Sequence, residues 1–174
     1  MELPDNIFII GPMGVGKTTI GRHLANVFKK NFLDTDHELE KRTGADISLI
    51  FEIEGEAGFR KRESAIINEL TAKNNLVLAT GGGAILSEQN RQTLRKNGFV
   101  LYLSADVETL VNRTRKDKSR PLLQTEDRRK TLTDMMAIRD PLYRQEADLI
   151  VKTDNRPPAI VARDVAAHIQ KQSR

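Results

Sequence analysis

The stretch IFIIGPMGVGKTT, residues 7–19, places four apolar residues directly before a glycine-rich segment. From Gly11 to Thr18 it matches the P-loop pattern of glycine, four residues, glycine, lysine, then serine or threonine. In such a loop, backbone amides converge on phosphate groups, and the N-terminus of the following helix favours an anion. Lys17 is expected at the β- and γ-phosphates of ATP, and Thr18 offers a hydroxyl ligand for Mg²⁺. A plain glycine-rich turn before a helix would not require this lysine and threonine. The residues expected to contact the nucleotide are Gly14, Val15, Gly16, Lys17, Thr18 and Thr19.

Around this loop, short apolar runs alternate with helical patterns. The runs occupy residues 7–10, 31–33, 76–80, 99–103 and 149–151. Helical spacing relates Ile20, Leu24, Val27 and Phe28, and again Phe59, Glu63, Ile66, Ile67 and Leu70, which predicts two helices packed on a sheet. Continuous apolar strands are typical of a parallel sheet that is covered on both faces. The sequence therefore predicts a doubly wound, three-layer α/β/α sandwich, formed as one domain over residues 1–174.

Composition limits the class of protein. The chain has 28 basic and 24 acidic residues, and a net charge of +4 is too mild to indicate nucleic-acid binding. It has no cysteine, which excludes disulfides and thiolate metal sites. The N-terminus lacks the basic start and apolar length of a signal peptide, and no run approaches the roughly 18 apolar residues of a membrane span. We expect a cytoplasmic protein without a membrane or nucleic-acid partner, in which the three histidines show no ligand spacing.

Two carboxylates follow the second apolar run, at Asp34 and Asp36. Because side chains alternate along a strand, both are predicted to share a face at its carboxyl end, where open α/β sheets bind ligands. One acid suits a metal and the other an acceptor. In the alternative interpretation, one of them merely caps a helix that begins near His37.

A segment from about residue 112 to 127 is dense in charge and interrupted by Pro121. It is predicted to be a mobile lid that carries Arg120. Closure of such a loop expels water and places charge on a migrating phosphoryl group. Alternatively, Arg120 is one more solvated cation.

Four further segments complete an ordered set: FRKRE at 59–63, GGG at 81–83, RPLL at 120–123 and RDPLY at 139–143. Together with the P-loop and the aspartate pair, they resemble the shikimate kinase family over nearly the whole chain. The resemblance implies a nucleoside-monophosphate-kinase-like fold with a five-stranded parallel sheet, in a monomer. It also implies transfer of the ATP γ-phosphoryl group to the 3-hydroxyl of shikimate, a step of chorismate and aromatic amino-acid biosynthesis.

The resemblance further implies roles for single residues. Asp34 would support the metal through water, Arg120 would meet the phosphates as the lid closes, and Arg156 would lie by the adenine. The implied contacts of shikimate are Asp36 with the ring hydroxyls, Arg60 and Arg139 with the carboxylate, and the amide of Gly82. The implied catalytic residues are Lys17, Asp36 and Arg120, with Asp36 either a base or an orienting group.

Without the resemblance, several of these residues have ordinary interpretations. Arg60 lies in a basic run that a solvated helix face would explain, and Arg139 resembles a cation near a helix C-terminus. The three glycines after residue 80 could be a plain turn. Two arginines nevertheless offer the planar donors that a carboxylate prefers, and Glu63 is placed to steady Arg60.

Other functions stay open at this level. A nucleotide-dependent switch or binding module would use the P-loop for signalling, although the guanine-reading Asn-Lys-x-Asp pattern is absent. A catalytically silent relative would be expected to lack the lysine, the metal ligand or the acid. A gluconate kinase or a nucleotide kinase would share the fold but use different acceptor residues.

Overall fold

A five-stranded parallel sheet forms the centre of the computed structural model, which describes residues 3–173; the expected domain 1–174 thus has its first two residues and its last outside the described part. The strands are β1 (Asn6–Ile10), β2 (Asn31–Asp34), β3 (Leu76–Ala79), β4 (Phe99–Ser104) and β5 (Leu149–Lys152). Their order is β2-β3-β1-β4-β5, and each neighbouring pair is parallel. All five predicted strands are confirmed, with each end within one residue of the prediction.

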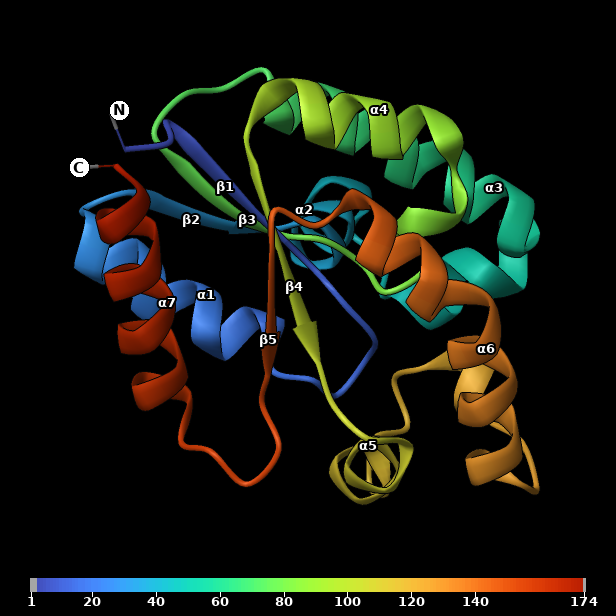
Figure 1. Ribbon diagram of the computed structural model, residues 1–174. Helices are drawn as coiled ribbons and strands as arrows, with labels where there is room; N and C mark the ends of the chain where they lie inside the picture. Colours follow the sequence, from blue (N-terminus) through green and yellow to red (C-terminus); the bar gives the residue numbers. More distant parts are fainter. Residues whose placement is uncertain (1–2, 174) are drawn as a thin grey trace.

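Helices cover both faces of this sheet, as predicted for a three-layer sandwich. They are α1 (Lys17–Phe28), α2 (Thr35–Thr43), α3 (Ile47–Thr71), α4 (Glu88–Asn97), α5 (Val107–Thr114), α6 (Arg128–Glu146) and α7 (Pro158–Gln172), with short 3₁₀ helices at Ala84–Leu86 and Pro121–Leu123. Figure 1 shows α1 and α7 on one side of the sheet and α3 and α4 on the other.

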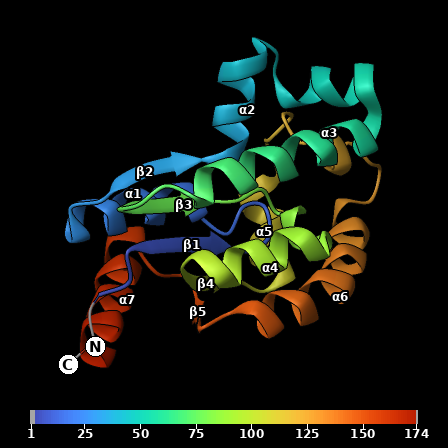
Figure 2. The same ribbon diagram turned by 90° about the horizontal axis from the view of Figure 1, so that it is seen from above.

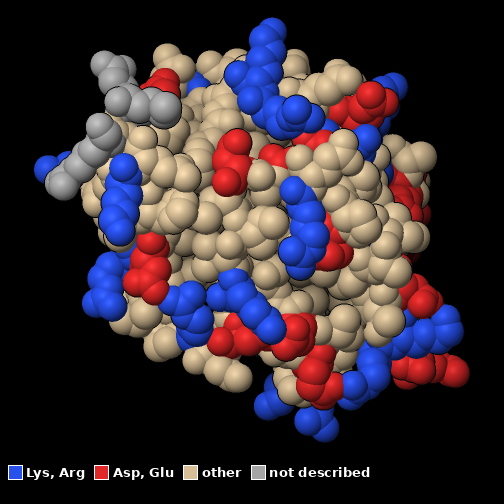
Figure 3. Space-filling view, viewed as in Figure 1, with Lys and Arg blue, Asp and Glu red and all other residues tan. Residues whose placement is uncertain are grey.

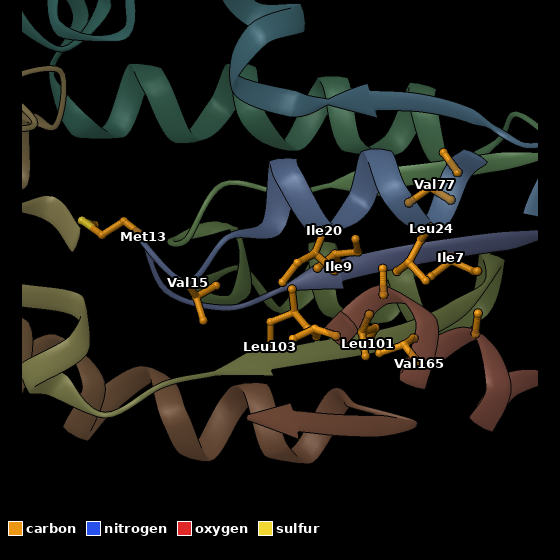
Figure 4. Packing of buried hydrophobic residues seen from close by; sticks show 14 of the residues in the cluster. Ile7, Ile9, Met13, Val15, Ile20, Leu24, Val77, Leu101, Leu103 and Val165 are labelled. Carbon is orange, nitrogen blue, oxygen red and sulfur yellow. The ribbon is translucent and has the colours of Figure 1, made fainter. Parts of the chain in front are cut away.

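The central strand divides its side chains between two cores. Ile7 and Ile9 join the cluster under α1 and α7, whereas Phe8 and Ile10 join the cluster under α3 and α4. All four are buried, as continuous apolar strands require when both faces of a sheet are covered. Figure 4 shows the first cluster, in which Ile9 lies near side chains from α1 and β4. One prediction for α1 is wrong: Val27 is 50% exposed, because it lies on the solvent side of the helix.

The helix α3 is interrupted at Gly55, whose φ of 71° and ψ of 178° are not helical. This backbone region is accessible essentially only to glycine. Arg62 donates two hydrogen bonds across the interruption to the carboxylate of Glu54, at 2.6 and 2.7 Å. The rings of Phe51 and Phe59, from the two halves of the helix, lie 4.7 Å apart between centroids. The interruption therefore turns the first half of α3 so that it faces the second.

The carboxyl ends of the strands all open toward one edge of the sheet. In Figure 2 this is the edge near which α2, the start of α3, and α5 and α6 gather. The P-loop follows β1, Asp34 ends β2, and the three glycines follow β3. Parallel α/β sheets bind ligands at this edge, so the fold brings the predicted functional segments to one place.

Within residues 3–173, the helices include none with the length and apolar character needed to cross a bilayer. On the face seen in Figure 3, basic and acidic side chains are interspersed.

Candidate active site

The P-loop wraps the N-terminus of α1. Gly14 and Gly16 have φ of 80° and 102°, so the main chain turns through conformations that side chains disfavour. A Cβ at Gly14 would lie 2.7 Å from a methyl carbon of Thr114 in α5, so the loop also packs too closely for a larger residue. The side chain of Val15 is buried in the core, which leaves only its main chain to face a ligand. This geometry fits a loop that presents amides to phosphate.

Lys17 begins α1 and reaches back over the loop. Its ammonium donates to the carbonyls of Gly11 and Pro12 at 2.7 and 2.8 Å. Burial of the ammonium, with the nearby Arg120 guanidinium, lowers the pKa of Lys17 to about 7. A cation that is poorly compensated in this way gains from an incoming phosphate, which would restore its charged form.

The two aspartates differ from the prediction that both lie on the strand. Asp34 ends β2, but Asp36 lies in the first turn of α2, which begins at Thr35 and not near His37. Asp34 Oδ1 accepts from the amides of Asp36 and His37, so the capping interpretation is confirmed for Asp34. Its other oxygen, Oδ2, accepts from the Thr18 hydroxyl at 2.7 Å. One carboxylate therefore both caps α2 and faces the P-loop.

Thr18 and Asp34 form an oxygen-only donor pair beside the loop. Hydroxyl and carboxylate oxygens suit Mg²⁺, which keeps several waters and takes only one or two protein ligands beside nucleotide phosphates. The described residues contain no cluster of three His, Cys, Asp or Glu side chains that would suggest a closed all-protein metal cage. The residues present therefore fit a magnesium ion that is shared with a bound nucleotide.

A hollow adjoins the P-loop at the edge of the sheet where parallel α/β folds bind ligands. We call it the acceptor cleft. Its lining combines apolar and charged side chains: Met13, Asp36, Ile47, Phe51, Phe59, Arg60, Glu63, Gly81, Gly82, Gly83, Arg120, Pro121, Leu122 and Arg139. A separate hollow at the P-loop, which we call the P-loop hollow, is lined by Gly14, Gly16, Lys17, Thr18, Thr19, Asp34, Asp36, Thr80, Gly81, Gly82, Arg113 and Arg120. Asp36, Arg120 and two of the glycines line both hollows, so the two sites share a boundary.

Asp36 stands at this boundary. Its Oδ1 is buried and has no hydrogen-bond partner in the part of the chain that is described, whereas Oδ2 lies 3.7 Å from Arg120. Burial, reinforced by the charge of Asp34, raises the pKa of Asp36. An unpaired carboxylate oxygen in such a position suits an incoming hydroxyl donor.

Arg60 is anchored in the acceptor cleft by carboxylates of its own helix. It donates to Glu63 at 2.9 Å and to Glu56 at 3.2 Å, which confirms the prediction that Glu63 steadies it. Glu63 is fully buried, and burial raises its pKa to about 7 despite this contact. The guanidinium packs directly on Gly83, where a Cβ would collide with it. The glycines after β3 therefore permit close approach of a charged side chain.

Arg139 lies within α6 and not near its C-terminus, contrary to the ordinary interpretation of its sequence context. It is only 5% exposed, and the ion pairs found among residues 3–173 include none for this guanidinium. Buried charges are normally paired. The arginine lines the acceptor cleft, so the missing anion is expected to come from a ligand.

The predicted lid begins later than expected, because residues 112–114 are the last turn of α5. The remaining segment contains the 3₁₀ helix Pro121–Leu123, and Leu123 is buried. Arg120 donates from Nε to Asp117 at 3.1 Å and approaches Asp36, so it lies over both sites. Its expected position between phosphate and acceptor is therefore compatible with this geometry.

Arg156 lies in a surface hollow beside the P-loop, together with Thr109, Asn112, Arg113, Asn155 and Pro157. It pairs with Asp164 and donates to the carbonyl of Lys152. Arg113 also lines the P-loop hollow, so the two hollows are adjacent. This is compatible with a nucleoside base at the end where Arg156 lies.

Sequence reasoning missed three residues that build the site. Arg113 was given no role of its own within the charged segment, but it donates to the carbonyls of Val15 and Thr153 and so braces the P-loop. Thr35 accepts from the amide of Gly81 at 3.0 Å and joins α2 to the glycine turn. Phe51 contributes an apolar ring to the wall of the acceptor cleft. The spacing of basic residues could not separate Arg113 from its neighbours, because its role depends on where α5 ends.

The site combines a P-loop with an oxygen pair that suits magnesium, as in enzymes that use ATP. The neighbouring cleft contains a cation and a carboxylate oxygen without partners among residues 3–173, and these suit a small, anionic, hydroxylated acceptor. The two together define an ATP-dependent small-molecule kinase. The comparison with known proteins agrees with this class and identifies the family within it. The shikimate kinase family matches residues 13–171 of the chain. The chain therefore belongs to the shikimate kinase family.

Individual relatives support the same assignment. A shikimate kinase of Pseudomonas fluorescens (strain Pf0-1) is 55% identical over 160 residues, covering 92% of this chain and 93% of that protein. The structure of shikimate kinase from Acinetobacter baumannii in complex with shikimate has a TM-score of 0.95 and 49% identity, covering 97% of this chain and 94% of that one. A gluconokinase from Sinorhizobium meliloti 1021 has a TM-score of 0.61 at 15% identity, covering 99% and 95%, and so shares the fold alone. Of the alternatives left open by the sequence, the comparisons thus favour a shikimate kinase over a switch or a gluconate kinase.

Proposed function

We propose that this chain transfers the γ-phosphoryl group of ATP to the 3-hydroxyl of shikimate, giving shikimate 3-phosphate and ADP. The observation that carries the proposal is the buried Arg139, which has no carboxylate partner among residues 3–173 and lies in a cleft that shares Asp36 and Arg120 with the P-loop hollow. A cleft of this kind calls for an acceptor with an anionic group at one end and a hydroxyl at the other. Shikimate has both.

The carboxylate of the acceptor would lie between Arg60 and Arg139. Guanidinium groups form planar, charge-assisted hydrogen bonds with carboxylates, so two of them fix orientation as well as charge. Arg60 is held by Glu63 before any ligand arrives, which reduces the ordering needed on binding. Gly82 lies beside Arg139 and would contribute an amide.

The ring hydroxyls would face Asp36, whose Oδ1 is buried and has no hydrogen-bond partner among residues 3–173. This carboxylate would orient the 3-hydroxyl and accept its proton as transfer proceeds; a general base contributes on the order of 10²–10⁴ in rate. Phosphoryl transfer depends mainly on positioning and charge, so orientation by Asp36 has value even if the proton moves late.

On the nucleotide side, amides of Gly14, Val15 and Gly16 would hold the phosphates, with Thr19 following in the first turn of α1 and Arg156 near the adenine. Thr18 would hold Mg²⁺ directly and Asp34 would support it through water. When bound, the ion neutralises charge on the β- and γ-phosphates. Lys17 would stabilise the same charge from the loop side.

Arg120 would complete the site as the lid, residues 115–127, closes over both substrates. Its guanidinium already lies over the boundary of the two sites, so a small movement would place it on the migrating group. Closure would also exclude water, which otherwise competes as an acceptor.

The family places the reaction in chorismate and aromatic amino-acid biosynthesis. We propose that the enzyme works as one domain and as a monomer in the cytoplasm, with ATP and shikimate as its partners and no role for nucleic acid or a membrane.

The test is ADP release in a coupled assay with purified protein, ATP and Mg²⁺, comparing shikimate, gluconate, nucleoside monophosphates and no acceptor. Turnover that depends on shikimate is the expected result. Turnover with another acceptor alone would keep the kinase class and reject the substrate. ATP binding without any acceptor-dependent turnover would favour a nucleotide-binding module.

A further inference from the structure

The lid holds the side chain of Arg120 with a carboxylate of its own. The guanidinium donates from Nε to Asp117 Oδ2 at 3.1 Å. Among residues 3–173 its terminal nitrogens have no hydrogen-bond acceptor, because Asp36 Oδ2 lies 3.7 Å away, beyond hydrogen-bond distance. A guanidinium has five N–H donors, of which Nε supplies one. The contact at Nε therefore restrains the guanidinium and leaves its terminal donors available to a phosphate.

Asp117 is held in place through its other carboxylate oxygen. Oδ1 accepts from the amide of Ser119 at 2.8 Å and also from the hydroxyl of Ser119. An aspartate turn of this kind fixes the carboxylate relative to its own main chain. Burial raises the pKa of Asp117, but the hydrogen bonds from Ser119 and Arg120 outweigh this effect and lower the pKa overall. Asp117 is therefore an ordered acceptor that is ionised at neutral pH.

The turn that contains Asp117 is attached to the P-loop through Thr114, the last residue of α5. The amide of Asp117 donates to the Thr114 carbonyl at 3.0 Å, and this carbonyl also accepts from Arg128 at the start of α6. Thr114 is buried against the P-loop, where a Cβ at Gly14 would lie 2.7 Å from its methyl carbon. These contacts place Arg120 relative to the phosphate-binding loop.

The main chain of Arg120 is anchored from the opposite side. Its carbonyl accepts from the amide of Leu123 at 3.0 Å and from the side-chain amide of Gln124. Leu123 is buried in the core cluster under α1 and α7. A fixed main chain does not by itself order a long arginine side chain, which loses rotamer freedom only when a contact holds it. Asp117 supplies that contact.

We propose that Asp117 is a positioning residue for phosphoryl transfer: its carboxylate orders the Arg120 guanidinium before the substrates bind and directs the terminal nitrogens toward the boundary of the two sites. This inference rests on the proposed function, in which Arg120 meets the migrating phosphoryl group. Ordering before binding reduces the entropy that is lost on reaching the transition state. Asp117 acts without touching a substrate, in contrast to Asp36.

An isosteric substitution, Asp117→Asn, separates the two carboxylate oxygens. Asparagine keeps an oxygen for Ser119 but presents its NH₂ group to Nε of Arg120, so that one donor faces another. Asp134→Asn is the matched control. It removes the same charge from an exposed aspartate of α6, which accepts from Lys130 at 2.6 Å and lines neither the acceptor cleft nor the P-loop hollow.

The first experiment compares the two variants by steady-state kinetics, with melting curves for both. Asp117→Asn is expected to lower kcat roughly ten-fold, the effect of losing one charge-assisted hydrogen bond. The KM values for ATP and shikimate should change less, because Arg120 acts on charge that develops during transfer. Asp134→Asn should leave kcat unchanged. An unchanged kcat in Asp117→Asn, or an equal loss in both variants, would overturn the proposal.

A double-variant cycle tests whether Asp117 acts through Arg120. Arg120→Ala removes the guanidinium, so the further substitution Asp117→Asn should lower kcat little more if the carboxylate has no other role. Losses that multiply in the double variant would show that Asp117 acts by another route, and they would contradict the positioning role.

A third measurement does not depend on the activity of a variant. In protein labelled with ¹⁵N-arginine, the Nε–H signal that is missing from Arg120→Ala belongs to Arg120. In the wild type this proton should lie downfield of solvated arginines and exchange slowly with water, and Asp117→Asn should abolish both features. If shikimate is turned over but the wild-type signal resembles that of a solvated arginine, the positioning role is wrong while the proposed function stands. If the wild type does not turn over shikimate at all, the proposed function itself fails.

Discussion

The P-loop and the acceptor cleft lie side by side, but they are built in different ways. The P-loop is contiguous in sequence, and the contacts proposed for it with a nucleotide come mostly from the main chain of residues 14–16. The acceptor cleft takes single side chains from α2, α3, the glycine turn, the lid and α6. A local motif depends on backbone conformation, whereas the cleft depends on the packing of distant elements.

The two sites also handle charge differently. At the P-loop one lysine, with a pKa lowered to about 7, lies over carbonyls of its own loop. In the cleft, Arg60 is paired with Glu63, while Arg139 has no carboxylate partner in the described part of the chain. The cleft therefore contains one cation that is already paired before a ligand binds and one that has no carboxylate partner in the described residues. This arrangement favours an anionic acceptor.

The largest effect is expected from Lys17→Ala, which tests whether the P-loop depends on this one side chain. Loss of a group that stabilises the transferring charge should lower kcat by about 10²–10³-fold. The melting curve should change little. Coupled ADP release measures the effect, with Lys41→Ala, at an exposed position on α2, as the control. Near-normal turnover in a folded Lys17→Ala protein would contradict the nucleotide-binding role.

Arg139→Ala should mainly affect the other site. Loss of a charge-assisted pair with the acceptor carboxylate costs about 1.5–3 kcal/mol, and it should raise the KM for shikimate while leaving the KM for ATP unchanged. Arg144→Ala is a suitable control, because that arginine lies on the same helix but pairs with Asp140. Arg139→Lys should restore only part of the affinity, since lysine lacks the planar fork. A change confined to the KM for ATP would contradict this role and assign Arg139 to the nucleotide site.

Gly55→Ala tests whether the bend of α3 shapes the cleft. Forcing alanine into this backbone conformation should cost about 1–3 kcal/mol of unfolding free energy, with a fall in Tm of roughly 2–4 °C per kcal/mol for a chain of this size. Because Phe51 and Phe59 lie on opposite sides of the interruption, the KM for shikimate should rise as well. Gly44→Ala is the control: its φ is also positive, at 69°, but it ends α2. Equal kinetic effects in both variants would argue against a specific role for the bend.

The smallest effect expected is a pH dependence of the free energy of unfolding, which arises from Glu63 in the acceptor cleft and not from the P-loop. Burial raises the pKa of Glu63 from 4.5 to about 7, although Arg60 and Arg139 oppose the shift and Asp36 adds to it. Between pH 4.5 and 7 the unfolded chain therefore releases the proton more readily than the folded protein does, so stability falls as pH rises. Glu63→Gln does not titrate, and the wild type should lose stability relative to this variant across that range. Thermal melts from pH 4 to 8 measure the difference; parallel curves would show that Glu63 is not perturbed.

Sequence alone located the sheet because its strands are short, continuous and apolar. The ends of each of the five strands were predicted to within one residue. The P-loop pattern was also placed correctly, between a strand and a helix. The aspartate pair shows the limit. Alternation along a strand was assumed through Asp36, but the capping of α2 by Asp34 ends the strand two residues earlier. Local hydrogen bonding outweighed the extended pattern there.

What the sequence determined by itself is therefore the class of fold and the phosphate-binding loop, since both follow from local periodicity and from backbone demands within a dozen residues. Only the tertiary structure decided which arginines matter. Arg139 differs from solvated arginines in its burial, and Arg60 and Arg113 differ from them in their hydrogen-bond partners, not in neighbouring sequence. Burial and pairing depend on side chains that are brought together from distant segments, and no local pattern contains that information.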